Sequence, residues 1–168
     1  RECGLELIDV SNPASPTFVG ACDTPESASG VYVTGNNAYV ADKAGGLQVI
    51  SLSNPASPTL VGAHDISGYA YGVFVSGNQA YLADEASGLQ IISVSNPASP
   101  ARAGSYDTPE WAQGVFIDGS FAYVADAWSG LQIINVSNPA SPALAGSCDT
   151  PEYAYGVYVS GSYAYVAD

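Results

Sequence analysis

The sequence predicts an all-β protein made of four copies of one four-stranded antiparallel unit, arranged radially as the blades of a β-propeller. One hexapeptide, Ser-Asn-Pro-Ala-Ser-Pro, recurs at a constant spacing, beginning at Ser11, Ser53, Ser95 and Ser137. Short runs rich in Val, Ile, Tyr and Leu alternate with Gly, Asn, Asp, Ser and Pro, which is the pattern of strands and turns. No segment keeps the periodicity of a helix. Four-stranded units of about 40–50 residues are typical of propellers.

The repeats make residues 1–168 a single domain of four units. The units are 4–45, 46–87, 88–129, and 130–168 together with 1–3. The last unit lacks three residues, and Arg1-Glu2-Cys3 take the place of those three at the start of the chain. The chain has neither an initial Met nor a secretion signal, so we expect a mature or excised segment.

Each unit contains four runs that we expect to be strands. In one blade they are residues 30–34, 37–42, 46–52 and 59–64. The third run is apolar on both alternating faces, which is typical of a strand with neighbours on both sides in a sheet packed between two others. The fourth begins directly after a proline, which cannot donate to a ladder and therefore predicts an edge strand.

The hexapeptide is predicted to be the turn of the outermost hairpin. Asn12 can close an Asx turn, Pro13 presets φ for the first turn position, and Pro16 leads into the edge strand. Gly20, in that strand, fits a twisted edge that discourages pairing with other molecules. These structural reasons suffice, so no binding role is assigned to the turn.

Three runs resemble the LVIVD repeat and, more loosely, YVTN-type propeller repeats. They are Leu5-Glu6-Leu7-Ile8-Asp9, Gly30-Val31-Tyr32-Val33 and Ala38-Tyr39-Val40-Ala41-Asp42. The resemblance covers the whole chain. It implies a propeller and a secreted or surface-attached protein, in families whose biochemical role is often unknown. The sequence departs from the pattern where Asp9 is replaced by Ser51, Ser93 and Asn135 in the other units.

One blade is divided between the two ends of the chain. By this assignment the chain starts with the third and fourth strands of a blade and ends with its first and second, so residues 5–22 should complete the sheet begun by 156–168. Closure within one chain is favoured because the effective concentration is high. Closure between chains would be strand addition, giving an eight-bladed ring of two chains or an open head-to-tail fibre.

Composition argues against several classes of function. Three basic residues stand against sixteen acidic ones, for a net charge of −13, so nucleic-acid binding is not expected. No apolar run is long enough for a membrane helix. The single histidine, His64, has no suitably placed nucleophile and carboxylate, and no phosphate loop or metal-binding spacing occurs. We expect no enzyme activity and no required cofactor, at an extracellular or cell-surface location.

Acidic residues recur at the ends of the second strands, on one predicted rim. Such carboxylates could bind Ca²⁺, which prefers several oxygen ligands. The alternative, which the wide spacing favours, is that they accept backbone N–H bonds in turns. These weak Ca²⁺ candidates are Asp42, Asp84, Asp126 and Asp168.

The same rim carries the variable positions of the repeat, and this pattern is typical of a binding surface on a rigid scaffold. Exposed Trp and Tyr beside carboxylates suit a surface glycan or a protein partner, whereas the structural alternative is that they cover the core between blades. The candidates are Tyr69, Tyr71, Trp111, Trp128, Tyr153 and Tyr155, with Glu26, Glu110 and Glu152, and the loops around Lys43, Glu85 and Arg1 vary too.

Cys3 and Cys22 are expected to lie nearly opposite each other in the first hairpin, so a disulfide between them is predicted. Cys148 would then be unpaired or intermolecular.

The sequence therefore favours a non-catalytic structural or interaction module. Its partners would be itself, through neighbouring subunits or flanking repeats, or a surface component. A carbohydrate- or protein-binding propeller, with or without assistance from Ca²⁺, is the alternative.

Overall fold

The computed structural model describes residues 4–168, and this part of the chain is entirely strands, turns and loops. It holds no helix that could span a membrane. The strands follow the repeat closely, since the expected runs 30–34 and 59–64 are strands at these bounds. The strands are β1 (Gly4–Asp9), β2 (Thr17–Asp23), β3 (Gly30–Thr34), β4 (Asn37–Ala41), β5 (Leu47–Ser51), β6 (Thr59–His64), β7 (Ala70–Ser76), β8 (Gln79–Asp84), β9 (Gly88–Ser93), β10 (Ala101–Tyr106), β11 (Ala112–Asp118), β12 (Phe121–Asp126), β13 (Leu131–Asn135), β14 (Ala143–Cys148), β15 (Gly156–Ser160) and β16 (Tyr163–Ala167).

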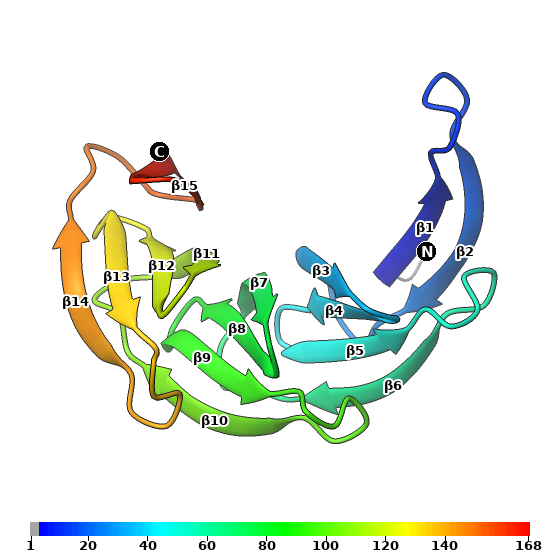
Figure 1. Ribbon diagram of the computed structural model, residues 1–168, viewed down its shortest axis with the longest axis horizontal. Helices are drawn as coiled ribbons and strands as arrows, with labels where there is room; N and C mark the ends of the chain where they lie inside the picture. Colours follow the sequence, from blue (N-terminus) through cyan, green and yellow to red (C-terminus); the bar gives the residue numbers. More distant parts are fainter. Residues whose placement is uncertain (1–3) are drawn as a thin grey trace.

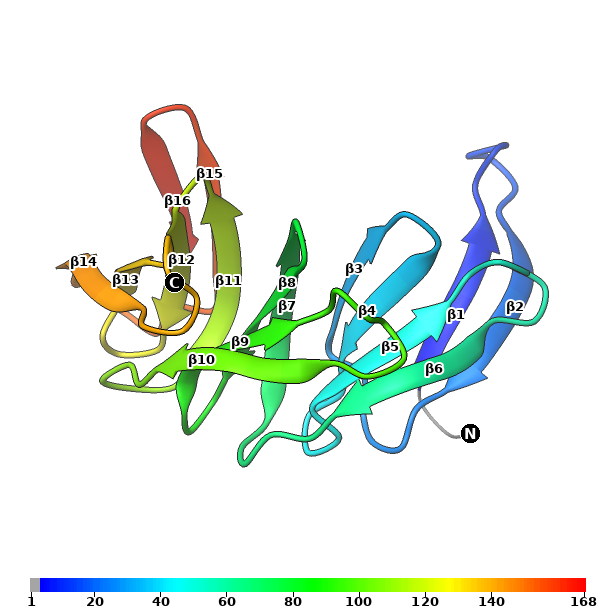
Figure 2. The ribbon, with the colours of Figure 1, turned by 60° about the horizontal axis from the view of Figure 1, so that its bottom comes forward.

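The strands form three complete blades and two half-blades. Strands β3–β6, β7–β10 and β11–β14 each make a four-stranded antiparallel sheet, whereas β1–β2 and β15–β16 are separate two-stranded sheets. The sheets stand side by side in an arc (Figures 1 and 2). Strands β3, β7 and β11 line its concave side, and β6, β10 and β14 its convex side (Figure 1). The all-β, propeller-like prediction is confirmed.

The prediction of closure within one chain is not met in this structure. The half-blade β15–β16 and the half-blade β1–β2 do not pair with each other, and they lie at the two separated arms of the arc (Figure 1). Contacts between neighbouring sheets set the curvature, and four repeats at this curvature do not bring the ends together. We call the blade divided between these two half-blades the seam.

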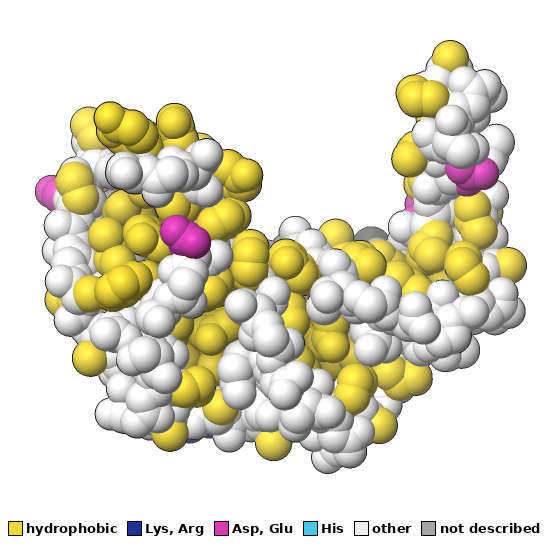
Figure 3. Space-filling view, viewed as in Figure 1, with side chains coloured by type: hydrophobic (Ala, Val, Ile, Leu, Met, Phe, Trp, Pro, Cys, Tyr) yellow, Lys and Arg dark blue, Asp and Glu magenta, His cyan; other side chains and the backbone are white. Residues whose placement is uncertain are grey.

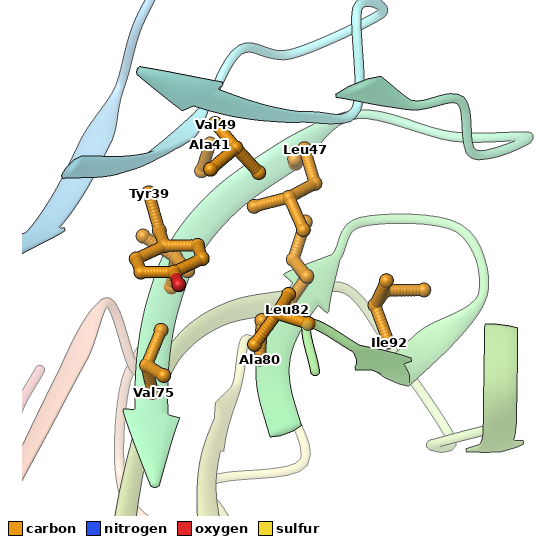
Figure 4. Packing of buried hydrophobic residues seen from close by; sticks show 11 residues of the cluster. Tyr39, Ala41, Leu47, Val49, Val75, Ala80, Leu82 and Ile92 are labelled. Atoms are coloured by element: carbon orange, nitrogen blue, oxygen red, sulfur yellow. The ribbon is translucent and has the colours of Figure 1, made fainter. Parts of the chain in front are cut away.

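Neighbouring blades are held together by apolar side chains between their sheets. Tyr39, Leu47 and Val49 of one blade face Val75 and Leu82 of the next (Figure 4). Leu47 and Leu82 are completely buried, and burying such a side chain contributes about 1.5–3 kcal/mol. The central strands β5 and β9 are buried on both faces, as the sequence predicted.

The hexapeptide forms the expected turn and also makes a contact that the sequence did not predict. Asn12 accepts hydrogen bonds from Ala14 N through its side chain (3.2 Å) and from Ser15 N through its carbonyl (2.9 Å). In each following repeat this turn packs on a glycine of the preceding outer strand. A Cβ on Gly20 would overlap the carbonyl oxygen of Pro55, so this glycine serves contact between repeats and not only the twist of an edge. The same contact joins Gly62 with Pro97 and Gly104 with Pro139.

Candidate functional site

The acidic positions at the ends of the second strands form buried clamps inside two of the blades. Thr24 Oγ1 donates to Asp42 Oδ1 at 2.6 Å, and the backbone N–H of Glu26 donates to Asp42 Oδ2 at 2.9 Å. Asp42 is completely buried. The clamp fixes the loop that enters β3 against the end of β4.

Asp126 repeats this arrangement in the third complete blade. Thr108 Oγ1 and the backbone N–H of Glu110 donate to its two carboxylate oxygens at 2.6 and 3.1 Å. Burial raises the pKa of Asp126, although both hydrogen bonds favour its ionised form. These carboxylates thus accept the turn hydrogen bonds that the sequence favoured over Ca²⁺ binding. Within residues 4–168 no three His, Cys, Asp or Glu side chains gather as they would to hold a metal, and Asp168 is exposed.

Asp84 occupies the same position without a clamp. The residues equivalent to Thr24 and Glu26 are Ile66 and Gly68, so the hydroxyl donor is missing. Asp84 is completely buried, and neither of its carboxylate oxygens has a hydrogen bond of good geometry. Burial raises its pKa, and the nearby Ser87 hydroxyl and the backbone amides of Ala86 and Gly68 offset this only in part.

Aromatic residues of the predicted rim come together near the C-terminal arm of the arc. The rings of Trp128 and Tyr153 meet edge to face with centroids 5.6 Å apart, and Tyr153 and Tyr155 follow at 4.6 Å. Trp128 is 61% exposed and Tyr155 62% exposed. We call Trp128, Tyr153 and Tyr155 the aromatic rim cluster.

Charged and phenolic groups, most of them from other repeats, act electrostatically on Tyr153 of this cluster. The pKa of Tyr153 is raised chiefly by burial, and repulsion from neighbouring groups adds to this effect. Those groups are Tyr155, Glu85, Tyr71 and Glu110. Tyr71 also lies beneath the ammonium of Lys43, whose Nζ is 6.0 Å from the ring centroid. Residues of all four repeats therefore contribute to this rim.

The other predicted rim residues remain outside the cluster. Trp111 and Tyr69 are each about half exposed, and neither takes part in the ring contacts made within residues 4–168. Glu26 and Glu152 are exposed as well. Glu110 lies near Tyr153 through electrostatics and also contributes its backbone to the clamp of Asp126.

The sequence reasoning missed an aromatic ladder on the concave side of the arc. It runs along the innermost strands through Tyr32, Phe74, Phe116 and Tyr158, with successive centroids 4.6, 5.0 and 4.9 Å apart. Hydrophobic side chains are visible along this concave side in the space-filling view (Figure 3). The sequence contains an indication of this ladder, because the corresponding position of the repeat is aromatic in all four units.

Both ends of the arc expose surfaces that are buried in the interior blades. Val33 is 55% exposed, whereas its equivalent Val75 is 5% exposed. At the other end Tyr165 is 59% exposed, against 4% for its equivalent Tyr39. A groove of about 250 Å³ lies beside β1, lined by residues that include Leu5, Ala28, Val31 and Val40.

One partner of the predicted disulfide, Cys22, lies in strand β2. It is opposite Leu5 in the pairing of β1 with β2. Cys3 lies outside the described residues, so the Cys3–Cys22 disulfide stays a prediction. Cys22 is partly buried and Cys148 is exposed.

The repeated antiparallel sheets, packed face to face around a concave aromatic side, define a propeller-type β-repeat protein. The LVIVD repeat model matches residues 1–24, 25–65, 67–108, 111–150 and 151–168, and the chain belongs to the LVIVD repeat family. The first and last matches are each shorter than the other three, and together they make up one whole repeat.

Similar solved structures include two computationally designed proteins. Ika8 superposes with a TM-score of 0.73 and 6% identity over 90% of this chain and 46% of that chain. Ika4 superposes with a TM-score of 0.71 and 6% identity over 85% of this chain and 86% of that chain. The chain thus spans about half the length of Ika8. At this identity the likeness shows the fold alone. No curated protein matches the sequence.

Proposed function

We propose that this chain is a non-catalytic structural or interaction module of the extracellular space or cell surface, which binds further repeats of its own kind through its two open ends. The observation that carries the proposal is a pair of missing contacts. Gly146 and Gly156 have no neighbour at the place where the equivalent glycines of the other repeats touch the next repeat. The groups that would fill these places occur at the opposite end of the chain.

The periodicity identifies those groups. Gly20, Gly62 and Gly104 each contact a proline carbonyl in the turn of the next repeat. If this pattern is continued from the last repeat into the first, the partner of Gly146 is the carbonyl of Pro13. The inner-strand glycines contact the backbone of the next repeat in the same way: Gly30 meets Tyr71, Gly72 meets Gln113, and Gly114 meets Tyr155. Continued from the last repeat into the first, this pattern makes Ser29 the partner of Gly156.

The unpaired strand edges are complementary in register. In a complete blade β4 pairs with β5, with Tyr39 opposite Val49 and Ala41 opposite Leu47. The same register in the seam would place Tyr165 opposite Leu7 and Ala167 opposite Leu5. Each half-blade would thereby gain the main-chain bonds of a central strand pair, which is the mode of strand addition.

The exposed faces also match. In the interior, Tyr39 packs in the same cluster as Val73 and Val75. The equivalent Tyr165 and the equivalents Val31 and Val33 are exposed at opposite ends of the arc. Joining the two ends would bury all three side chains, and burial of apolar area at about 25 cal/mol per Å² drives such association. The joining repeats would come from a second copy or from flanking repeats of a longer chain.

The non-catalytic and extracellular parts of the proposal rest on chemistry. The acidic positions serve as turn acceptors at Asp42 and Asp126, and the chain has one histidine and a net charge of −13. A strongly negative surface opposes non-specific association, so that contacts are restricted to the matching ends.

Light scattering coupled to gel filtration, together with negative-stain microscopy, tests the association of the purified chain. We expect discrete rings or head-to-tail filaments. Gly146→Val should abolish them, because its Cβ fits the free chain but would overlap the incoming turn. Ala145→Val is the matched control, since Val19 and Val61 occupy this position in other repeats. A wild-type chain that stays monomeric at all concentrations, or a Gly146→Val variant that assembles normally, would contradict the proposal.

A second candidate function is binding of a surface carbohydrate or protein at the rim. The exposed rings of Trp128 and Tyr155 favour it, because stacking on such rings is a common mode of recognition. Ca²⁺ would assist only if the exposed Asp168 gained oxygen partners from the ligand. Glycan binding that is lost in Trp128→Ala and retained in Trp111→Ala would support it.

A further inference from the structure

The rim already contains one bound ammonium group, supplied by the chain itself. Lys43 Nζ lies 6.0 Å from the centroid of the Tyr71 ring, a distance at which a cation is attracted to the face of the ring. The backbone of Lys43 holds this position through a left-handed conformation (φ 43°) and through paired hydrogen bonds with Ala70 of 3.1 Å each. The arrangement shows that an ammonium group can lie against the face of a rim tyrosine.

The same backbone occurs two repeats later without the lysine. Ala127 is the equivalent of Lys43, with a φ of 47° and a bridge to Ala154 like that between Lys43 and Ala70. Tyr155 is the equivalent of Tyr71, since it too lies two repeats further along the chain. The side chain that would bring a cation to Tyr155 is therefore reduced to a methyl group. Strand pairing holds the two loops in the same way, so the difference lies in the side chain.

Two further rings stand beside Tyr155. The equivalent of Tyr153 is Tyr69, which lies near Tyr71, but Trp128 has no aromatic counterpart there. Trp128 takes the place of an alanine, Ala44, in the first repeat. It meets Tyr153 edge to face at 5.6 Å, and Tyr153 lies 4.6 Å from Tyr155. Tryptophan is the ring that attracts cations most strongly. Three adjacent rings, two of them mostly exposed, are the composition of an aromatic cage.

The charges around the cluster favour a cation over a neutral ligand. Glu85 and Glu110 both act electrostatically on Tyr153. Within residues 4–168 the basic side chains are Lys43 and Arg102, and Arg102 donates to Ser105 in β10. Lys43 is held at Tyr71, so the negative potential at Trp128 and Tyr155 has no cation of its own.

We propose that Trp128, Tyr153 and Tyr155 bind an alkylammonium group, with quaternary ammonium preferred. A methylated ammonium spreads its charge over methyl groups that contact ring faces, and it loses less hydration on binding than a primary ammonium. The group could belong to a choline-type molecule or to a methylated lysine of a peptide. The site is independent of the association through the seam, because it uses residues of the rim and not of the open edges.

Tryptophan fluorescence in a Trp111→Phe background, where Trp128 is the single tryptophan, measures the binding of tetramethylammonium, choline and a trimethyl-lysine peptide. The neutral control ligand is 3,3-dimethylbutanol, which has the shape of choline without its charge. We expect saturable binding of the cations, about tenfold tighter than that of the neutral analogue. A stronger response to choline or to the peptide identifies the source of the group, and either response supports the proposal.

Three variants localise the site, with binding followed by NMR titration so that loss of Trp128 can be included. Tyr155→Ala and Trp128→Ala should weaken binding about tenfold or more. Ala127→Lys should do so as well, because its own ammonium would occupy the ring as Lys43 occupies Tyr71. Trp111→Ala, which removes another exposed tryptophan outside the cluster, should leave binding unchanged. Equal affinity for the neutral analogue, selective binding of sugars at the cluster, or unaltered cation binding in Ala127→Lys would overturn the proposal.

Discussion

Replacing Asp84 by Asn should stabilise the protein at neutral pH, although the residue is buried and recurs in every repeat. Ionised Asp84 lies in the interior without a hydrogen bond of good geometry. A buried group left unsatisfied costs about 1–3 kcal/mol, and more when it is charged. Asparagine keeps the shape and removes the charge, so we expect a gain of at least about 1 kcal/mol. For a chain of this size that corresponds to a rise in Tm of roughly 2–4 °C per kcal/mol.

The pH dependence of this gain follows from the raised pKa of Asp84. The folded protein binds the Asp84 proton more readily than the unfolded chain does, so ionised Asp84 lowers stability above its folded pKa. As the pH falls through the folded pKa towards the ordinary value of 3.8, this penalty disappears. The difference in stability between Asp84→Asn and wild type should therefore be largest near neutrality and shrink with acidification.

The matched control is Asp126→Asn, measured by urea denaturation across the same pH series. Its carboxylate accepts hydrogen bonds from Thr108 and from the Glu110 backbone, and a hydrogen bond to a charged group contributes about 1.5–3 kcal/mol. Loss of the backbone bond should outweigh relief of the buried charge and destabilise the protein by about 1 kcal/mol or more. Equal destabilisation by the two substitutions would show that Asp84 has partners as good as those of Asp126, and would refute the missing clamp as the cause.

Three further predictions concern single side chains in the repeat. Ile66→Thr should stabilise the protein by about 1 kcal/mol in urea unfolding, because it gives Asp84 the hydroxyl donor that Thr108 gives Asp126. The gain depends on the Asp84 carboxylate, so it should vanish in the Asp84→Asn background. Gly62→Val should lower Tm strongly because its Cβ meets the Pro97 carbonyl, whereas Gly146→Val should leave the Tm of the monomer unchanged in calorimetry. Glu6→Gln should tighten association about tenfold in sedimentation equilibrium, equivalent to about 1.4 kcal/mol. Glu6 is exposed, whereas its equivalents Gln48 and Gln132 are buried, so joining the ends would bury it, and a neutral amide is less costly to bury than a carboxylate; unchanged affinity would argue against the proposed seam.

The local architecture could be predicted because each strand and turn is encoded by neighbouring residues. The constant spacing of the hexapeptide, the prolines before the outer strands and the doubly apolar third run were sufficient to place the strands. The clamp of Asp42 by Thr24 was accessible in part, because turn residues predict an acceptor role for Asp. The exception at Asp84 is visible in the sequence as Ile66 in place of threonine, but its cost depends on burial that the sequence alone does not give.

The contacts between repeats could not be derived in the same way. Gly20 and Gly62 are recognisable as recurrent glycines, yet the reason for them is a carbonyl from the turn of the following repeat. The openness of the arc depends on the angle between packed sheets, and the pattern of strands and turns within one repeat does not specify this angle. The aromatic rim cluster was predicted as a set of variable positions, and the structure selected Trp128, Tyr153 and Tyr155 from it while leaving Trp111 outside.

The glutamine position of the repeat explains why the two ends of the arc differ from an ordinary interior contact. Gln48, Gln90 and Gln132 are buried, and each donates to the carbonyl of the residue three positions before it. The seam has Glu6 at this position. An ionised glutamate cannot donate this bond, and burying it costs free energy. A joined seam, as proposed above, would therefore be weaker than the contacts that hold the interior blades, although its strands and apolar faces match. Such a joint would be able to open and re-form while the rest of the chain stays folded, as the proposed association with further repeats requires.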